Sequence, residues 1–193
     1  MGQDLFNALS TTALARRLLG CILIHECSEG IAAGRIVETE AYLHSVDPAS
    51  HSHGGKTARN AAMFGNSGHA YIYFIYGRHH CFNVVSGKTG EGEAVLIRAL
   101  EPVGGIDLMA RRRGLSAEDR DLTNGPAKLV EALAIRRDQN GIDLRHGALR
   151  IQWEKAVVPS AIIAGPRIGI SKARDMPLRF VVKGSHHLSK PLR

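Results

Sequence analysis

Extended, strand-like runs of residues follow one another along this chain, and turns rather than helices join most of them. Runs rich in β-branched and aromatic residues, bounded by Gly, Pro, Asn, Asp or Ser, are typical of β-strands. Because strands joined as hairpins pair antiparallel, the sheet is expected to be mostly antiparallel. The pattern predicts strands at residues 21–25, 32–43, 94–100, 149–153, 167–170 and 178–183, and a hairpin over residues 69–86.

Helical segments are fewer and lie between these strands. Ser10 or Thr11 can cap a short helix that Gly20 ends. Residues 102–113 and 126–135 are also predicted to be helical, and the second of these segments begins with a proline, which suits the first helical position. Hairpins combined with separate helices predict an α+β fold with a curved, mostly antiparallel sheet, flanking helices and a protruding β-hairpin.

The size and charge of the chain restrict its class further. Its 193 residues, 44% of them hydrophobic, suffice for one compact domain with a real core, which we expect to span residues 1–193. The net charge of +7 indicates a polyanionic partner without identifying it. Cys21, Cys27 and Cys81 lack paired spacing, so they are predicted to be reduced thiols. With neither a signal sequence nor a long apolar run, a cytoplasmic protein that does not contact membranes is expected.

The segment GRIVETEAYL, residues 34–43, is unusual because it places carboxylates in a strand. If the segment is extended, Ile36, Glu38, Glu40 and Tyr42 share one face. Two carboxylates and a phenol on one face of an otherwise apolar strand are costly to bury without a function. The alternative is an edge that faces solvent, and this segment alone leaves both interpretations open.

Histidines gather in the irregular stretch that follows, residues 45–60, and irregular loops of this length are usually functional. His44, His51 and His53 lie near the two glutamates in sequence, and imidazole and carboxylate are ordinary ligands of zinc or iron. Their spacing matches no known ligand pattern, and isolated loop histidines are mostly solvated. We therefore predict no metal site.

Aromatic residues concentrate in the predicted hairpin. Tyr71 and Tyr73 share a face, and Tyr76 lies at the tip beside Gly77 and Arg78. A large aromatic residue next to an arginine at an exposed tip suits insertion between base pairs in a minor groove. The alternative is a tip that folds back onto its own domain.

Together these segments resemble the alkyladenine, or methylpurine, DNA glycosylase family from about Leu14 to Ser185. No single motif is decisive, but eight motifs in the same order are highly specific. They are GRIVETEAY, AxHSxGG at residues 49–55, ARNAAMF at 58–64, YIYFIYG at 71–77, FNVV at 82–85, IRALEP at 97–102, NGPAKL at 124–129 and PLRFVVKGS at 177–185.

The resemblance implies a role for particular residues. Glu40, the second Glu of ETEAY, would position and deprotonate the attacking water, and Arg98 of RALEP would help to hold that water and the carboxylate. Since Arg98 is cationic, we expect its charge to keep Glu40 ionised. The flipped base would stack between three side chains, with Asn83 at the pocket floor disfavouring normal guanine and Tyr76 filling the gap in the duplex. The three stacking residues are Tyr42, His51 and Tyr73.

The implied activity is that of a monofunctional base-excision repair DNA glycosylase. Such an enzyme flips alkylated or deaminated purines, among them 3-methyladenine, 7-methylguanine, hypoxanthine and ethenoadenine, out of double-stranded DNA. It then hydrolyses the N-glycosidic bond and leaves an abasic site. An alkylated purine is a cationic leaving group, so one ionised carboxylate suffices for the chemistry. No cofactor is expected, no lysine is marked for Schiff-base chemistry, and the family precedent is a monomer.

Two alternatives come from other functional classes. The first is a non-catalytic DNA-damage binding protein that flips the base while Glu40 is idle. The second is a metal-dependent hydrolase that uses His51, His53 and Glu40.

Overall fold

The structure is a computed structural model that describes residues 4–75, 77 and 79–192. Its strands are β1 (Ile22–Cys27), β2 (Gly30–Tyr42), β3 (Ala70–Ile75), β4 (His79–Ser86), β5 (Glu93–Gly104), β6 (Leu149–Gln152), β7 (Ile162–Gly165) and β8 (Arg179–Val182). Its α-helices are α1 (Leu5–Ala8), α2 (Thr11–Leu18), α3 (Ile106–Arg113) and α4 (Pro126–Ala132). Short 3-10 helices span Ala61–Phe64, Arg120–Leu122, Arg137–Gln139 and Pro159–Ala161.

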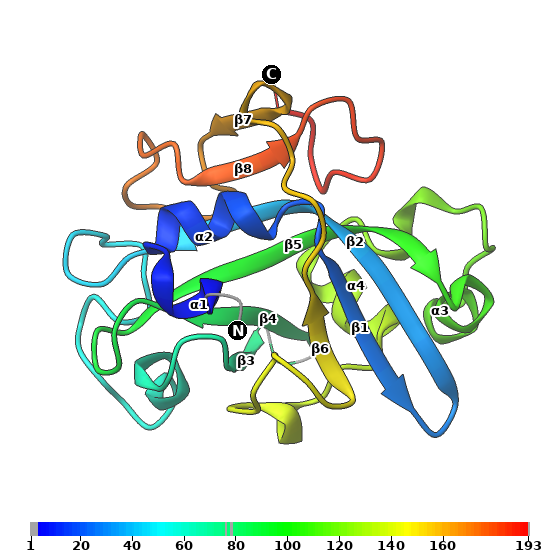
Figure 1. The fold of residues 1–193 in the computed structure, drawn as a ribbon, viewed down its shortest axis with the longest axis horizontal. Coiled ribbons are helices and arrows are strands. Elements are labelled where there is room, and N and C mark those ends of the chain that lie inside the picture. Colours follow the sequence, from blue (N-terminus) through cyan, green and yellow to red (C-terminus); the bar gives the residue numbers. More distant parts are fainter. Residues whose placement is uncertain (1–3, 76, 78, 193) are drawn as a thin grey trace.

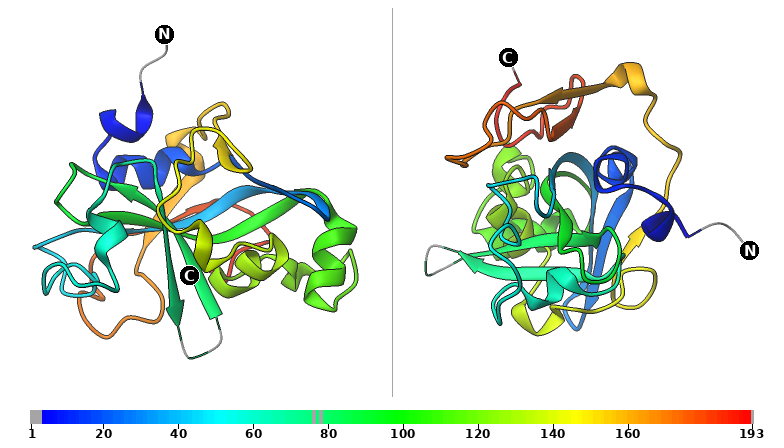
Figure 2. Two further views of the ribbon diagram at one scale, coloured as in Figure 1. Left: turned by 90° about the horizontal axis from the view of Figure 1, so that it is seen from below. Right: turned by 90° about the vertical axis from the view of Figure 1, so that its left-hand side faces the viewer.

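The strands of the described residues form one curled, antiparallel sheet (Figure 1). Its main order is β3-β4-β5-β2-β1-β6, and β8 joins β2 while β7 pairs with β8. Helix α2 lies on one side of this sheet, α3 and α4 lie on the other, and the β3–β4 hairpin protrudes from the body (Figure 2). The α+β fold with a mostly antiparallel sheet, flanking helices and a protruding hairpin is therefore confirmed.

Strand β2 lies at the centre of the sheet and carries both glutamates of the ETEAY motif. It pairs with β5 along one edge, and with β1 and then β8 along the other. Glu38 and Glu40 are fully buried, so of the two interpretations left open by the sequence, the solvent-facing edge is excluded. Register shifts on both sides of Glu38 interrupt the simple alternation of side chains. Ile36 accordingly belongs to the same core cluster as Ala41, which was expected on the other face.

Most predicted elements are confirmed, but one is wrong in part and another is wrong. Residues 102–104 continue β5 instead of beginning a helix, and α3 starts only at Ile106. The strand tolerates Pro102 because this residue pairs beside a register shift, where a missing N–H costs little. Residues 167–170 form no strand, because Gly169 has a φ of 76° and the backbone N–H of Ile168 bonds a side chain.

A large hydrophobic core fills the space between α2, the sheet and the helices α3 and α4. A second, smaller cluster of buried residues lies where the 3-10 helix Ala61–Phe64 meets β3, β4 and β5, and Tyr42 and Tyr73 pack against it. No helix of the described residues is both long and apolar enough to cross a membrane.

The two glycines that flank α3 allow a test of how tightly this helix is joined to the sheet. Gly105 and Gly114 both adopt left-handed backbone conformations, with φ of 66° and 62°. A Cβ on Gly105 would collide with the backbone carbonyl of Ile31, whereas one on Gly114 would meet nothing within 4 Å. We expect Gly114→Ala to lower the free energy of unfolding by about 1–2 kcal/mol, the cost of a left-handed alanine. Gly105→Ala should lower it clearly further.

Urea denaturation of both variants measures the difference, with Gly114→Ala as the control for backbone strain alone. Equal losses in the two variants would mean that the close approach of α3 to β2 contributes nothing to stability.

Candidate active site

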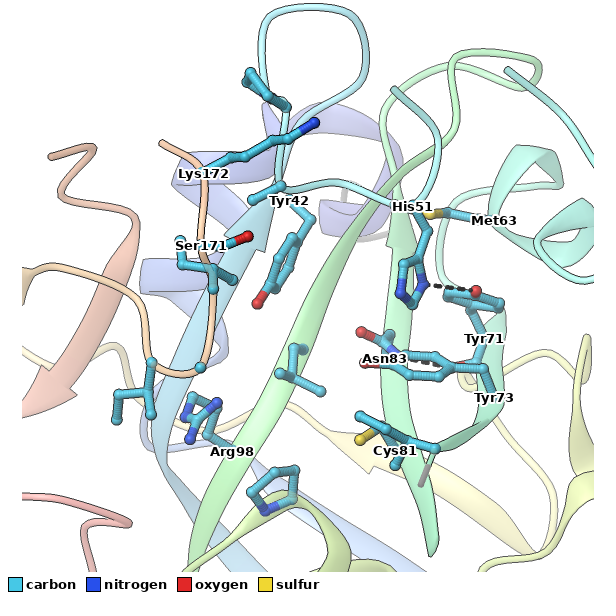
Figure 3. Close-up of a pocket in the computed structure, with 18 residues that line it drawn as sticks. Tyr42, His51, Met63, Tyr71, Tyr73, Cys81, Asn83, Arg98, Ser171 and Lys172 are labelled. Carbon is cyan, nitrogen blue, oxygen red and sulfur yellow. Dashed lines mark hydrogen bonds between the residues drawn. The ribbon is translucent and has the colours of Figure 1, made fainter. Parts of the chain in front are cut away.

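A cavity of about 480 Å³ opens between the C-terminal end of β2, the loop at residues 45–60, the β3–β4 hairpin and the segment at residues 168–172 (Figure 3). Five of the residues predicted from the sequence line it, namely Tyr42, His51, Tyr73, Asn83 and Arg98. The wall also contains residues that sequence reasoning did not assign, among them Met63, Tyr71, Cys81, Ile168 and Lys172. The structure thus brings together side chains from segments that are far apart in the sequence.

Glu40 lies directly behind this wall and is fully buried. One carboxylate oxygen, Oε1, accepts the backbone N–H of Ile168 at 2.8 Å. The other, Oε2, accepts the hydroxyl of Tyr42 at 2.8 Å and lies 3.4 Å from Nη1 of Arg98. The carboxylate therefore contacts three residues that themselves line the cavity.

The protonation of Glu40 depends on opposing effects. Burial raises its pKa, whereas the charge of Arg98 and the hydrogen bonds from Ile168 and Tyr42 lower it; the net direction is upward. Arg98 thus acts in the expected direction but does not outweigh the loss of hydration. Burial, with the negative charge of Glu40, raises the pKa of Tyr42 well above its ordinary value, so this hydroxyl remains a donor.

Aromatic rings form opposite walls of the cavity. Figure 3 shows Tyr42 on one side, with His51 and Tyr73 across the open space. The rings of His51 and Tyr73 pack edge to face with their centroids 4.6 Å apart, and Nδ1 of His51 lies 3.1 Å from the hydroxyl of Tyr71. Burial and the charge of Arg59 lower the pKa of His51, which favours the neutral ring.

Asn83 is fixed in place at the β3–β4 pair. Its side-chain amide donates to the backbone carbonyl of Tyr71 at 2.9 Å, the residue directly opposite in the antiparallel register. Burial raises the pKa of Tyr71 to about 12. A buried amide held in this way presents a rigid surface to whatever enters the cavity.

Two further side chains, which sequence reasoning missed, hold the loop that carries His51. The amide of Asn60 donates to the carbonyls of His51 and Gly55, at 2.9 and 3.0 Å. Asp47 forms a buried ion pair with Arg167, with distances of 2.5 and 2.7 Å. Asn60 belongs to the ARNAAMF motif, which was a signal, but nothing in the sequence links Asp47 to a residue 120 positions away.

Arg167 also connects this ion pair to the cavity wall. Its Nη1 donates to the carbonyl of Ala41 at 3.0 Å, and its guanidinium lies 4.6 Å from the ring centroid of Tyr42. It directly precedes Ile168, whose N–H bonds Glu40. One ion pair therefore joins the loop, the strand and the segment that contacts the carboxylate.

Tyr76 lies outside the described residues, between the end of β3 and the start of β4. The part of the chain that the structure describes contains no group of three or more His, Cys, Asp or Glu side chains arranged to hold a metal ion.

Comparison with known proteins gives consistent matches. A family model described as methylpurine-DNA glycosylase matches residues 4–186. Proteins from Methanoculleus marisnigri and Carboxydothermus hydrogenoformans are 51% and 50% identical over 188 and 186 residues, covering 96% of both chains in each case. A protein from Francisella tularensis is 45% identical over 185 residues, 94% of this chain and 95% of its own. All three are named "Putative 3-methyladenine DNA glycosylase".

These matches, which extend over nearly the whole chain, define the protein as a hydrolase that acts on N-glycosyl bonds and has DNA as its substrate. The chain belongs to the methylpurine-DNA glycosylase family.

The buried pair between Asp47 and Arg167 provides a test of what holds the cavity together. Asp47→Asn keeps the volume but leaves the guanidinium of Arg167 buried without its counter-charge. We expect a loss of about 3–5 kcal/mol in the free energy of unfolding, as found when one partner of a buried pair is removed. Asp138→Asn, which breaks an exposed pair with Arg136, should change the unfolding midpoint little.

Urea denaturation of both variants measures this difference. Equal midpoints for Asp47→Asn and the unmodified protein would contradict the role of the ion pair.

Proposed function

We propose that the protein is a monofunctional base-excision repair glycosylase that removes alkylated or deaminated purines from double-stranded DNA. Its lesions would include 3-methyladenine, 7-methylguanine, hypoxanthine and ethenoadenine, and its product would be an abasic site. One observation carries the proposal: the fully buried carboxylate of Glu40, bonded to Tyr42 and close to Arg98, lies behind a cavity with aromatic walls.

The cavity suits a purine that has left the base stack. Flipping a base costs about a few kcal/mol, least for a damaged one, and each aromatic stacking contact returns about 1–3 kcal/mol. A purine between Tyr42 on one side and His51 and Tyr73 on the other would recover much of that cost. Electron-poor alkylated purines gain most from aromatic faces, and a neutral His51 does not repel them.

Discrimination against normal guanine would come from Asn83. Because its amide is bonded to the backbone of Tyr71, the side chain is not free to move away from a base that enters. The exocyclic amino group of guanine would meet it, whereas adenine-type and hypoxanthine bases lack that group at the same position. 7-Methylguanine keeps the amino group, but its positive charge strengthens stacking on the aromatic walls and makes it a better leaving group, which would offset this contact.

Hydrolysis would use Glu40 as the general base. As a water oxygen bonds to the sugar C1′, Glu40 takes its proton, and the electron pair of the breaking N-glycosidic bond passes to the purine nitrogen. The carboxylate also stabilises the positive charge that develops on the sugar, and Arg98 helps to hold the water and the carboxylate. Tyr42 and Arg98 line the cavity and contact Oε2 of Glu40, so the water would be held between them.

The remaining features of the proposal concern DNA and the cell. Tyr76 would fill the gap that the flipped nucleotide leaves, at the tip of the protruding hairpin. We propose that one domain spanning residues 1–193 acts as a monomer in the cytoplasm and needs no cofactor. The net charge of +7 favours binding to the phosphate backbone.

Glu40→Gln tests the proposed function directly. Glutamine keeps the shape of the side chain and an acceptor for the N–H of Ile168, but it cannot take a proton from water. We expect binding to lesion-containing duplex to be nearly unchanged and base release to fall by about 10²-fold or more. Freed base is measured from 7-methylguanine and hypoxanthine duplexes, with and without a chelator.

Glu101→Gln, a change at a half-exposed position on β5, is the control and should release base normally. Loss of release on chelation would favour the metal-dependent hydrolase, and no release by the unmodified protein would favour the damage-binding protein. Normal release by Glu40→Gln would exclude the role of Glu40 as the base.

The raised pKa of Glu40 predicts where activity fails in acid. Only the ionised carboxylate accepts a proton, so the rate falls as pH drops through this pKa, and burial moves that point to higher pH. We expect the acidic limb of the single-turnover rate to lie above the usual range of a glutamate. A 7-methylguanine duplex is the substrate of choice because its base is already cationic; a limb within or below that range would contradict the assignment.

A further inference from the structure

Glu38, the other glutamate of the ETEAY motif, has no part in the proposed chemistry but has the denser set of contacts. It is fully buried and accepts four hydrogen bonds. The guanidinium Nε atoms of Arg98 and Arg179 donate to Oε1 at 3.1 and 2.8 Å. Ser189 donates its backbone N–H to Oε2 at 2.6 Å and its hydroxyl to Oε1 at 2.8 Å.

The same contacts restrict the guanidinium of Arg98. Its Nε points to Glu38 while its Nη1 points to Glu40, 3.4 Å away. The hydroxyl oxygen of Ser189 lies 3.4 Å from Nε and 3.3 Å from Nη2 of Arg98, where it can accept. The hydroxyl has a single proton, which it donates in the hydrogen bond to Glu38. Its lone pairs therefore face the guanidinium.

Ser189 reaches this position because the chain after β8 turns back toward the sheet. In Figure 1 this segment, residues 185–192, leaves β8 as a loop and returns beside it. Arg179 donates to the carbonyl of Lys190, and a Cβ on Gly165 would lie only 2.6 Å from Leu192, so the segment packs closely on β7 and β8. Ser189 lies beyond residue 186, where the match to the family model ends.

We propose that Ser189 is a positioning residue of the glycosylase reaction: it holds Glu38, and through this carboxylate and its own hydroxyl it orients Arg98 toward Glu40. The inference rests on the proposed function, because it assigns Ser189 an effect on a reaction at Glu40. A flexible arginine side chain has many rotamers, and misplacement of a group in the site reduces the rate even where substrate still binds. If the segment only stabilised the fold, its substitution would not lower the rate while leaving substrate binding unchanged.

Ser189→Ala removes the hydroxyl but keeps the backbone N–H that bonds Glu38. We expect the single-turnover release of 7-methylguanine to fall about tenfold, the effect of one hydrogen bond. The dissociation constant for lesion duplex and the urea midpoint should change little. Ser189→Thr, which keeps the hydroxyl, should restore most of the rate. Ser185→Ala, in the same segment, removes a hydroxyl that accepts from the N–H of His187 and should have the rate of the unmodified protein.

A double-mutant cycle shows whether the effect passes through Arg98. If it does, Ser189→Ala causes no further loss of rate in an Arg98→Ala background. A full tenfold loss in that background, a parallel loss of lesion binding, or failure of Ser189→Thr to restore the rate would each overturn the proposal.

Glu40→Gln in the same assay distinguishes failure of the proposed function from failure of the role of Ser189. Base release by Glu40→Gln at the normal rate would overturn the proposed function and the role of Ser189 with it. An inactive Glu40→Gln beside a fully active Ser189→Ala would overturn the role of Ser189 alone.

Discussion

The burial of two carboxylates in β2 is the constraint on which the rest of the site depends. Glu38 and Glu40 have no exposed surface, and an ionised carboxylate without water needs charged or N–H partners. Those partners come from elements far apart in the sequence: Arg98 on β5, Arg179 on β8, and the backbone N–H groups of residues 168 and 189. The hydrogen bonds to the two carboxylates therefore also hold the segments at residues 168–172 and 185–192 against β2.

The two carboxylates differ in how completely they are satisfied, and this difference separates their roles. Glu38 accepts four hydrogen bonds, two of them from guanidinium groups within 3.1 Å. Glu40 has one backbone N–H, one phenol and a single guanidinium at 3.4 Å, and burial raises its pKa. The raised pKa of Glu40 favours acceptance of a proton, which supports its proposed role in proton transfer. The alternating pattern of the strand could not distinguish between the two glutamates; the resemblance implies Glu40 as the base, and the sparser contacts of Glu40 support that proposal.

Patterns of neighbouring residues predicted the local structure, but they could not predict contacts between residues far apart in the sequence. The cap of α2 at Ser10 and the β3–β4 hairpin follow from residues adjacent in sequence, and both were predictable. The prediction of a helix at 102–113 began too early because Pro102 is also tolerated at a strand irregularity, which depends on the partner strand. The links from Asp47 to Arg167 and from Glu38 to Ser189 join residues 120 and 151 positions apart, and no periodicity marks them.

The balance of charge around Glu40 explains how a protein with a net positive charge could bind a positively charged purine. Arg98 and Arg179 contribute two positive charges, and Glu38 and Glu40 contribute two negative charges within one hydrogen-bonded group. Lys172 also lines the cavity, but Figure 3 shows it beside the backbone end of Tyr42, away from Arg98. The end of the cavity next to Glu40 is thus close to neutral, so the cationic purine of the proposed function would meet no net repulsion there. The net charge of +7 therefore comes from residues outside this group, and such a charge attracts DNA phosphates.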